Sequence, residues 1–158
     1  MPNWCMNTAV ITAPDKKSAT AFAAYLKEKE GAEWLSYFLP IPEDMKEDWY
    51  SWNINSWGTK WDCDTTWKRK GQTFTLSFDS AWAPPIAMYE HLHCEGWEVE
   101  AHYLETGMAF AGKFSEGFDE CCNYGNGEEI PTDIDEQWGL TDMLAEWEEE
   151  NEGDCDDE

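Results

Sequence analysis

The stretch from Asn55 to Asp62, NSWGTKWD, places two tryptophans around a glycine and a lysine. Tryptophan rings stack on nucleobases and a lysine ammonium pairs with phosphate, so these residue types can together bind a nucleotide. Such a ligand cleft would draw on six residues of the surrounding sequence: Trp49, Trp52, Trp57, Lys60, Trp61 and Trp82. Tryptophan is used mostly to fill cores, however, and Gly58 suits a tight corner. We therefore favour a rigid corner of the fold, with Trp57 and Trp61 packed at the edge of the core.

Cysteine and histidine supply a second set of chemically active groups. Zinc takes thiolate and imidazole ligands, and five residues have suitable side chains: His91, His93, Cys94, Cys121 and Cys122. Their spacing matches no closed four-ligand pattern, and the six cysteines include no CxxC pair. We predict no metal and no cofactor, and we expect the cysteines to remain thiols in a reducing compartment.

Sequence motifs for catalysis are missing. The chain has no GxSxG, no glycine-rich loop that would cradle phosphate and no HExxH. Carboxylates are dense near the C-terminus, but a general acid needs a partly buried environment that raises its pKa, whereas crowded acids sit in solvent. We predict that the protein is not an enzyme.

Charge is distributed unevenly along the 158 residues. Residues 1–115 hold all ten Lys and Arg with 16 acids, a net charge of −6, whereas residues 116–158 hold 18 acids and no base, a net charge of −18. A field this negative repels phosphate backbones, which argues against direct binding to nucleic acid. No long apolar run and no basic leader is present, so we expect a cytoplasmic location without a membrane span.

Periodicity and turn signals predict the elements that must position these residues. Alternation predicts strands over 3–12, 65–68, 73–80, 97–104 and 108–114. The second and third of these form a hairpin around RKGQ. Amphipathic spacing predicts a helix from the N-cap Asp15 to Gly31, a short helix over 47–56, and a helix from Pro84–Pro85 to Gly96. This order indicates an α/β fold, an α+β sandwich of the ferredoxin-like, split βαβ kind with an antiparallel sheet and a Trp-rich helical insert.

A change in the sequence pattern near Gly117 marks the predicted domain boundary. Beyond it the alternating segments give way to the Gly, Asn and Pro punctuation of a loop. We therefore assign residues 1–116 to the ferredoxin-like domain and residues 117–158 to an acidic C-terminal extension, partly helical at 133–150.

Five motifs in the first part of the chain resemble those of the YubB-type ferredoxin-like family. They follow one another in the expected order over about residues 1–115: NWCMN, FLPIPED, WYSWNINSWGTKWD, FDSAWAPP and HYLETGMAFAG. The resemblance implies the ferredoxin-like fold and an origin on bacteriophages or conjugative plasmids. It carries over no catalytic residues, and the acidic extension lies outside it. The family name describes a fold only, and the cysteine spacing shows no iron–sulfur pattern.

The acids of the extension have a spacing close to that of nucleic-acid phosphates. Residues 133–150 hold eight acids, which on a helix is about one charge per 3.4 Å, the spacing along one DNA strand. The same segment has apolar anchors at Ile134, Trp138, Leu144 and Trp147, which a purely solubilising tail would not need. The sequence therefore favours a tail that docks on the domain and presents charge.

The leading hypothesis is a DNA mimic that occupies the basic channel of a host defence or DNA-processing protein, such as a restriction or CRISPR complex. The residues assigned to partner binding are Asp133, Asp135, Glu136, Trp138, Asp142, Glu146, Trp147, Glu148, Glu149 and Glu150. Two alternatives stay open. The Trp-rich domain would sequester a small ligand or nucleotide, with the tail serving solubility, or the protein would be a structural or assembly factor.

Overall fold

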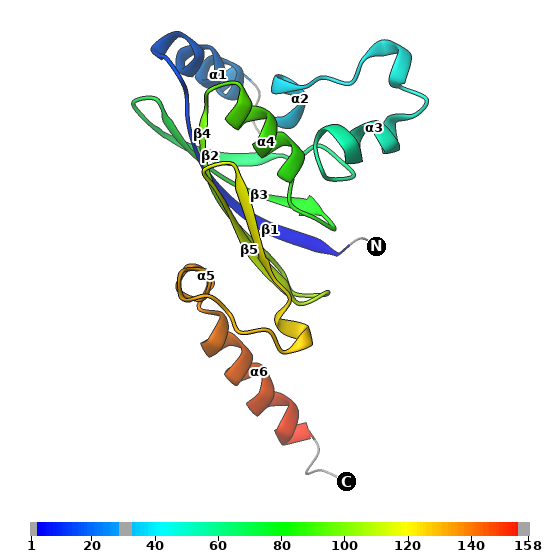
Figure 1. The fold of residues 1–158 in the computed structure, drawn as a ribbon, viewed down its shortest axis with the longest axis vertical. Helices are drawn as coiled ribbons and strands as arrows, with labels where there is room; N and C mark the ends of the chain where they lie inside the picture. The colour runs from blue at the N-terminus through cyan, green and yellow to red at the C-terminus, as the bar shows by residue number, and fades with distance from the viewer. Residues whose placement is uncertain (1–2, 29–32, 155–158) are drawn as a thin grey trace.

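The computed structural model describes residues 3–28 and 33–154, and its centre is a sheet with helices on both faces (Figure 1). Within these residues six strands form one antiparallel sheet in the order β2-β3-β1-β4-β5-β6. The strands are β1 (Trp4–Thr12), β2 (Thr65–Lys70), β3 (Thr73–Ala81), β4 (Glu98–Glu105), β5 (Phe110–Ser115) and β6 (Phe118–Cys122). The helices are α1 (Lys16–Glu28), α2 (Leu35–Phe38), α3 (Trp49–Ser56), α4 (Ile86–Cys94), α5 (Thr132–Trp138) and α6 (Leu140–Asp154), with short 3-10 turns η1 (Glu43–Met45) and η2 (Tyr124–Asn126).

The predicted α+β class with an antiparallel sheet is confirmed. The five predicted strands correspond to β1 to β5, and the helix predicted from Asp15 corresponds to α1. That helix begins as expected, because Asp15 Oδ1 accepts the Ser18 backbone N–H at 2.7 Å. Gly31, its expected end, lies outside the described residues, as do residues 155–158 of the predicted extension.

Strand β6 was not expected from the sequence. It pairs with β5 through a tight turn at Glu116 and Gly117, both of which have positive φ, 54° and 81°. Two adjacent residues at positive φ are the signature of the hairpin turn that matches sheet twist, and Glu-Gly between two short runs was the available signal. The sheet therefore continues past residue 116, and the boundary predicted near Gly117 falls inside a hairpin.

The main core lies between one sheet face and helices α1, α2 and α4. Along β1 the odd-numbered residues from Cys5 to Ile11 are buried on this face, while Trp4 and Met6 are exposed. Phe22 of α1 is central, because its ring centroid lies 4.9 Å from those of Phe38 and Phe74. The core is thus dominated by aromatic packing.

The NSWGTKWD corner separates its two tryptophans. Gly58 has a φ of 92°, and a Cβ there would lie 3.0 Å from the backbone nitrogens of Ile86 and Ala87, so the chain packs directly on the start of α4. Trp57 is 2% exposed and its Nε1 donates to the Leu39 carbonyl at 2.9 Å. Trp61, which we expected at the edge of the core, is 39% exposed. The corner is structural at Trp57 and open to solvent at Trp61.

This difference predicts unequal stability effects at the two tryptophans. Trp57→Ala removes a fully packed ring and is expected to lower the free energy of unfolding by about 3–5 kcal/mol. Trp61→Ala serves as the matched control and is expected to cost about 1 kcal/mol or less, because its ring leaves a partly solvated site. Urea unfolding of both variants measures the contrast, and equal losses would contradict this account of the corner.

Candidate functional site

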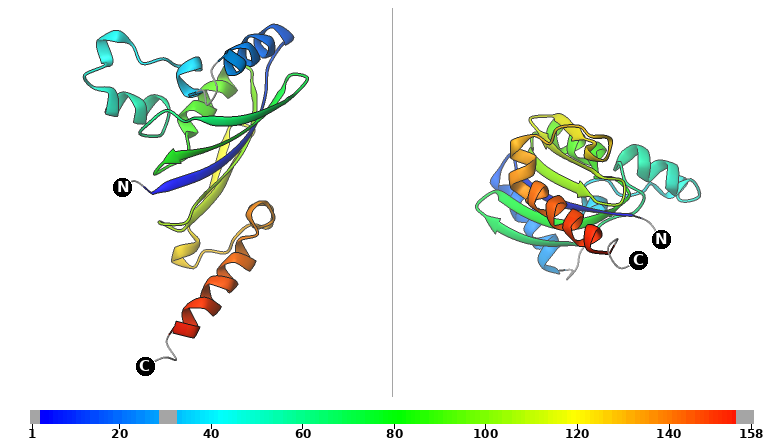
Figure 2. Two further views of the ribbon diagram at one scale, coloured as in Figure 1. Left: turned by 180° about the vertical axis from the view of Figure 1, so that it is seen from behind. Right: turned by 90° about the horizontal axis from the view of Figure 1, so that it is seen from below.

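The acidic extension folds into two helices that we call the acidic arm, residues 132–154. Its root packs on the sheet face opposite the main core, where Ile134 and Leu140 are fully buried against Leu104 of β4 and Ala111 of β5. Trp138 and Met143 are partly buried around this small cluster. Helix α6 then leaves the sheet and projects from the body (Figure 2). The arm is therefore anchored at its root and exposed along most of α6.

Two of the predicted partner-binding acids are occupied within the protein. Asp133 pairs with Lys113 at 3.3 Å, and Lys113 also lies 3.6 Å from Glu100. Partial desolvation acts to raise the pKa of Asp133, but the hydrogen bond from Lys113 and its charge hold that pKa below the usual value. Asp135 accepts hydrogen bonds from the Thr141 backbone at 2.7 Å and its hydroxyl at 2.8 Å, and these bonds lower its pKa. These carboxylates fix the arm and its bend at Gly139.

The remaining predicted acids face solvent. Glu136 lies on α5, and five acids of α6 are exposed: Asp142, Glu146, Glu148, Glu149 and Glu150. The apolar residues of α6 recur at helical spacing as one stripe, Leu140, Met143, Leu144 and Trp147. Burial fades along this stripe from Leu140, which is fully buried, to Trp147, which is 63% exposed. Of the expected anchors, Ile134 is fully buried and Trp138 and Leu144 are half-buried.

A histidine lies beneath the root of the arm. His102 of β4 is opposite Thr8 of β1 on one side and Lys113 of β5 on the other. Its Nδ1 is buried and has no hydrogen-bond partner in the described part of the protein. Desolvation and the Lys113 charge lower the pKa of His102, against smaller opposing effects of Glu100 and Asp133. The ring is therefore held neutral where the arm meets the sheet.

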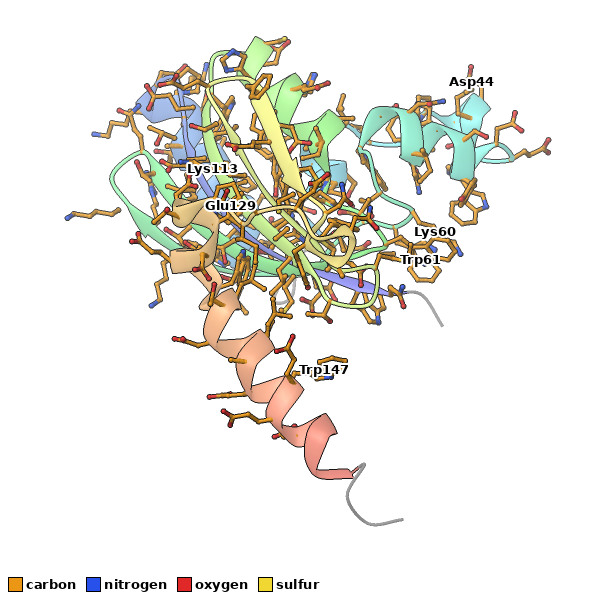
Figure 3. All side chains as sticks on the ribbon, turned by 60° about the horizontal axis from the view of Figure 1, so that its bottom comes forward. Asp44, Lys60, Trp61, Lys113, Glu129 and Trp147 are labelled. Carbon is orange, nitrogen blue, oxygen red and sulfur yellow. The ribbon has the colours of Figure 1, made fainter. Side chains whose placement is uncertain are left out.

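The six residues of the predicted ligand cleft fall into separate groups. Trp52 and Trp57 pack edge to face at 5.4 Å, and Trp49 packs on Tyr50. Lys60, Trp61 and Trp82 do come together: the Lys60 ammonium lies 4.5 Å from the Trp61 ring centroid and 6.0 Å from that of Trp82. Figure 3 shows Lys60 beside Trp61 on one flank of the body, with Trp147 on the projecting helix.

Further residues of this flank were missed from the sequence. Trp4, 50% exposed, lies 6.2 Å from Trp61 between ring centroids. A neighbouring cavity of about 460 Å³ is lined by Asn3, Trp82, Met108, Phe110 and Asn123. The alternation along β1 was the available signal, because burial of odd-numbered residues turns Trp4 to the other face. We call Trp4, Lys60, Trp61, Trp82 and this cavity the aromatic flank.

The candidate zinc ligands lie on two elements, with His91, His93 and Cys94 on α4 and Cys121 and Cys122 on β6. No group of three His, Cys, Asp or Glu side chains in the described ranges is arranged to hold a metal ion. The five cysteines of the described residues are free thiols, and burial raises the pKa of Cys5 to about 12 and also raises that of Cys63. Thiols held protonated in this way are poor nucleophiles. No helix among the described residues combines the length and apolar character that a membrane crossing needs.

Comparisons with known proteins give no relative from which a function could be taken. No protein-family model, curated protein or solved structure matches the chain. The resemblance to the YubB-type family stays a prediction. The acidic arm and the aromatic flank must therefore be interpreted from their own geometry.

The neutral histidine predicts acid sensitivity of the fold at the root of the arm. Because the folded-state pKa of His102 lies below its ordinary value of 6.5, the unfolded chain binds the proton first as the pH falls. The free energy of unfolding is expected to decrease as the pH drops below about 6.5. His102→Gln should flatten this part of the profile. Urea unfolding of both proteins at a series of pH values measures the profile, and an unaltered slope in His102→Gln would contradict the assignment.

Proposed function

We propose that this protein is a non-enzymatic DNA mimic that occupies the basic nucleic-acid channel of a host defence or DNA-processing protein. The observation that carries the proposal is the acidic arm, which presents exposed carboxylates on a helix projecting from the sheet (Figure 1). No Lys or Arg follows residue 113 in the sequence, so the exposed part of the arm has no base of its own. The exposed carboxylates of this helix therefore have no basic residue within the arm to pair with, and they remain accessible to a basic partner.

The charge spacing on α6 supports this role. Five acids fall between Asp142 and Glu150, which at a rise of about 1.5 Å per residue is about one charge per 2.7 Å of helix axis. Duplex DNA carries about one charge per 1.7 Å and one strand about one per 3.4 Å, so the arm lies between them. Asp133 and Asp135 leave the set of phosphate surrogates because they bind Lys113 and Thr141. The surrogates are then Glu136, Asp142, Glu146, Glu148, Glu149 and Glu150.

The apolar stripe of α6 supports a protein partner over a solubilising role. Charge complementarity accelerates encounter, whereas contacts that stay favourable after water is removed slow dissociation. Trp147, 63% exposed at the outer end of the stripe, is the residue type most often found at interface hot spots. Partner contact at α6 would therefore combine acids with an exposed indole.

We also infer that the first four strands form a ferredoxin-like unit, to which β5 and β6 are added. Their order β2-β3-β1-β4, with α1 and α4 as the two crossover helices, is the arrangement of a split βαβ pair. This inference is compatible with the YubB-type resemblance and with a mobile-element protein acting in the bacterial cytoplasm. Both remain parts of the proposal.

Charge reversal on α6 tests the mimic directly. The variant Glu146→Lys, Glu148→Lys, Glu149→Lys and Glu150→Lys is expected to lose partner binding, because a basic channel would then face a basic helix. The partner is obtained by capture from host lysate with the full chain, and affinity is measured from about 50 to about 500 mM salt. Binding should weaken steeply over this range, since exposed charges are screened within about 8 Å near 0.15 M salt. Excess duplex DNA should compete with the protein for the captured partner.

A matched variant separates local charge from total charge. Glu43→Lys, Asp44→Lys, Glu47→Lys and Asp48→Lys makes the same change in net charge on the insert, which Figure 3 shows far from α6 at Asp44. This control is expected to keep partner binding. Salt-insensitive binding that DNA does not displace, or equal losses in both variants, would overturn the proposal and leave the arm as a solubility device.

A further inference from the structure

Trp82 holds a backbone conformation that L-residues with large side chains rarely adopt. Its φ is 74°, in the left-handed region. The surrounding chain enforces it, because the Trp82 N–H donates to the Asn3 carbonyl at 2.8 Å and the Ser80 hydroxyl donates to the Ala83 carbonyl at 2.7 Å. The result is an indole that is 57% exposed. Backbone strain of this kind, at a residue whose apolar ring is exposed, is typical of a ligand site.

Lys60 brings a cation to the same indole. Its ammonium lies over the ring of Trp61 at 4.5 Å from the centroid and over that of Trp82 at 6.0 Å. No carboxylate of the described residues forms an ion pair with it, although the chain carries 34 acids. A lysine held on aromatic faces and away from acids keeps its charge available for an anion.

The cavity beside Trp82 is lined by uncharged side chains among the described residues, and two carboxylates hold its rim from behind: Glu105 accepts the Met108 N–H and Glu128 accepts the Asn123 N–H at 2.8 Å. Its volume of about 460 Å³ lies within the range of small-molecule sites, and its lining combines Trp82, Met108 and Phe110 with Asn3 and Asn123. The side-chain amides of both asparagines make no hydrogen bond within the described ranges. Met108 is placed by Glu105, which is 1% exposed and accepts the N–H groups of Gly107 at 2.7 Å and Met108 at 2.6 Å.

We propose that the aromatic flank binds a planar aromatic anion of the nucleoside monophosphate class. The base stacks on Trp82 and Met108, its polar edge meets the amides of Asn3 and Asn123, and the phosphate pairs with Lys60. A mononucleotide fits this chemistry better than a polynucleotide, because a net charge of −24 repels a long phosphate backbone while a single lysine suits one phosphate. The site is separate from α6, so it stands independently of the DNA-mimic function.

Calorimetric titration of the full chain with AMP, GMP, CMP and UMP tests this site. Trp82→Gly is the decisive variant, since it removes the stacking ring and at the same time relieves the positive φ. It should weaken binding about tenfold or more without lowering the urea midpoint. Phe118→Ala removes an aromatic ring that is 72% exposed at the start of β6 and lies outside the cavity lining, so it is the control and should bind as the wild type does.

Lys60→Gln tests the phosphate assignment through a comparison of AMP with adenosine. The variant is expected to lose affinity for AMP severalfold and to bind adenosine as before. Equal losses for both ligands would overturn the role of Lys60. No binding of any of the four monophosphates to the wild type, or unchanged binding in Trp82→Gly, would overturn the site as a whole.

Discussion

Side chains alternate strictly between the two faces of the sheet along β1. This alternation determines which residues enter the core and which are presented on the opposite face. Because β1 pairs with β3 on one side and β4 on the other, its parity is transmitted through the register to the whole sheet. Odd-numbered residues enter the aromatic core under α1 and α4. Even-numbered residues face the other side, where Trp4 reaches the aromatic flank and Thr8 lies opposite His102 beneath the acidic arm. A one-residue slip in the register of β1 would turn its core residues to the opposite face and bring the residues of both candidate surfaces into the core.

The same register explains why the arm is docked where it is. His102 and Lys113 are neighbours across β4 and β5, and Leu104 and Ala111 form the next cross-strand pair on the same face of the sheet. The first pair supplies the cation that holds Asp133, and the second supplies the apolar bed for Ile134 and Leu140. This patch is small, so it fixes the root of the arm and leaves most of α6 outside. The basic hairpin tip at Lys68–Lys70 forms no ion pair with the arm among the described residues, so the exposed acids are not neutralised there.

Local signals were enough for most elements but not for the grouping of side chains. The Asp15 cap, the RKGQ hairpin and the ends of α4 follow from turn and capping chemistry that acts within a few residues. The arm as a docked, charged helix followed from its apolar spacing, although Asp133 and Asp135 looked identical in sequence to the exposed acids. The ligand cleft could not be assembled from the sequence, because Trp57 is buried in the core against Trp52 while Trp61, four residues on, is 39% exposed beside Trp4. Trp4 joins Trp61 only through the sheet, more than fifty positions away in the chain.

The two proposed surfaces place opposite electrostatic demands on one molecule. A net charge of −24 would steer the proposed basic partner toward the arm, and it opposes the approach of any phosphate to the aromatic flank. The flank would meet this demand by short-range contacts, with a lysine beside two indoles and a cavity whose lining side chains, among the described residues, are uncharged. Salt screens the long-range repulsion and the long-range attraction alike within about 8 Å at physiological strength. Added salt therefore weakens the arm's interaction, while at the flank the loss of repulsion offsets the loss of a single ion pair and leaves stacking in place. The separation of charge from aromatic surface would thus allow one small chain to hold both proposed sites without one cancelling the other.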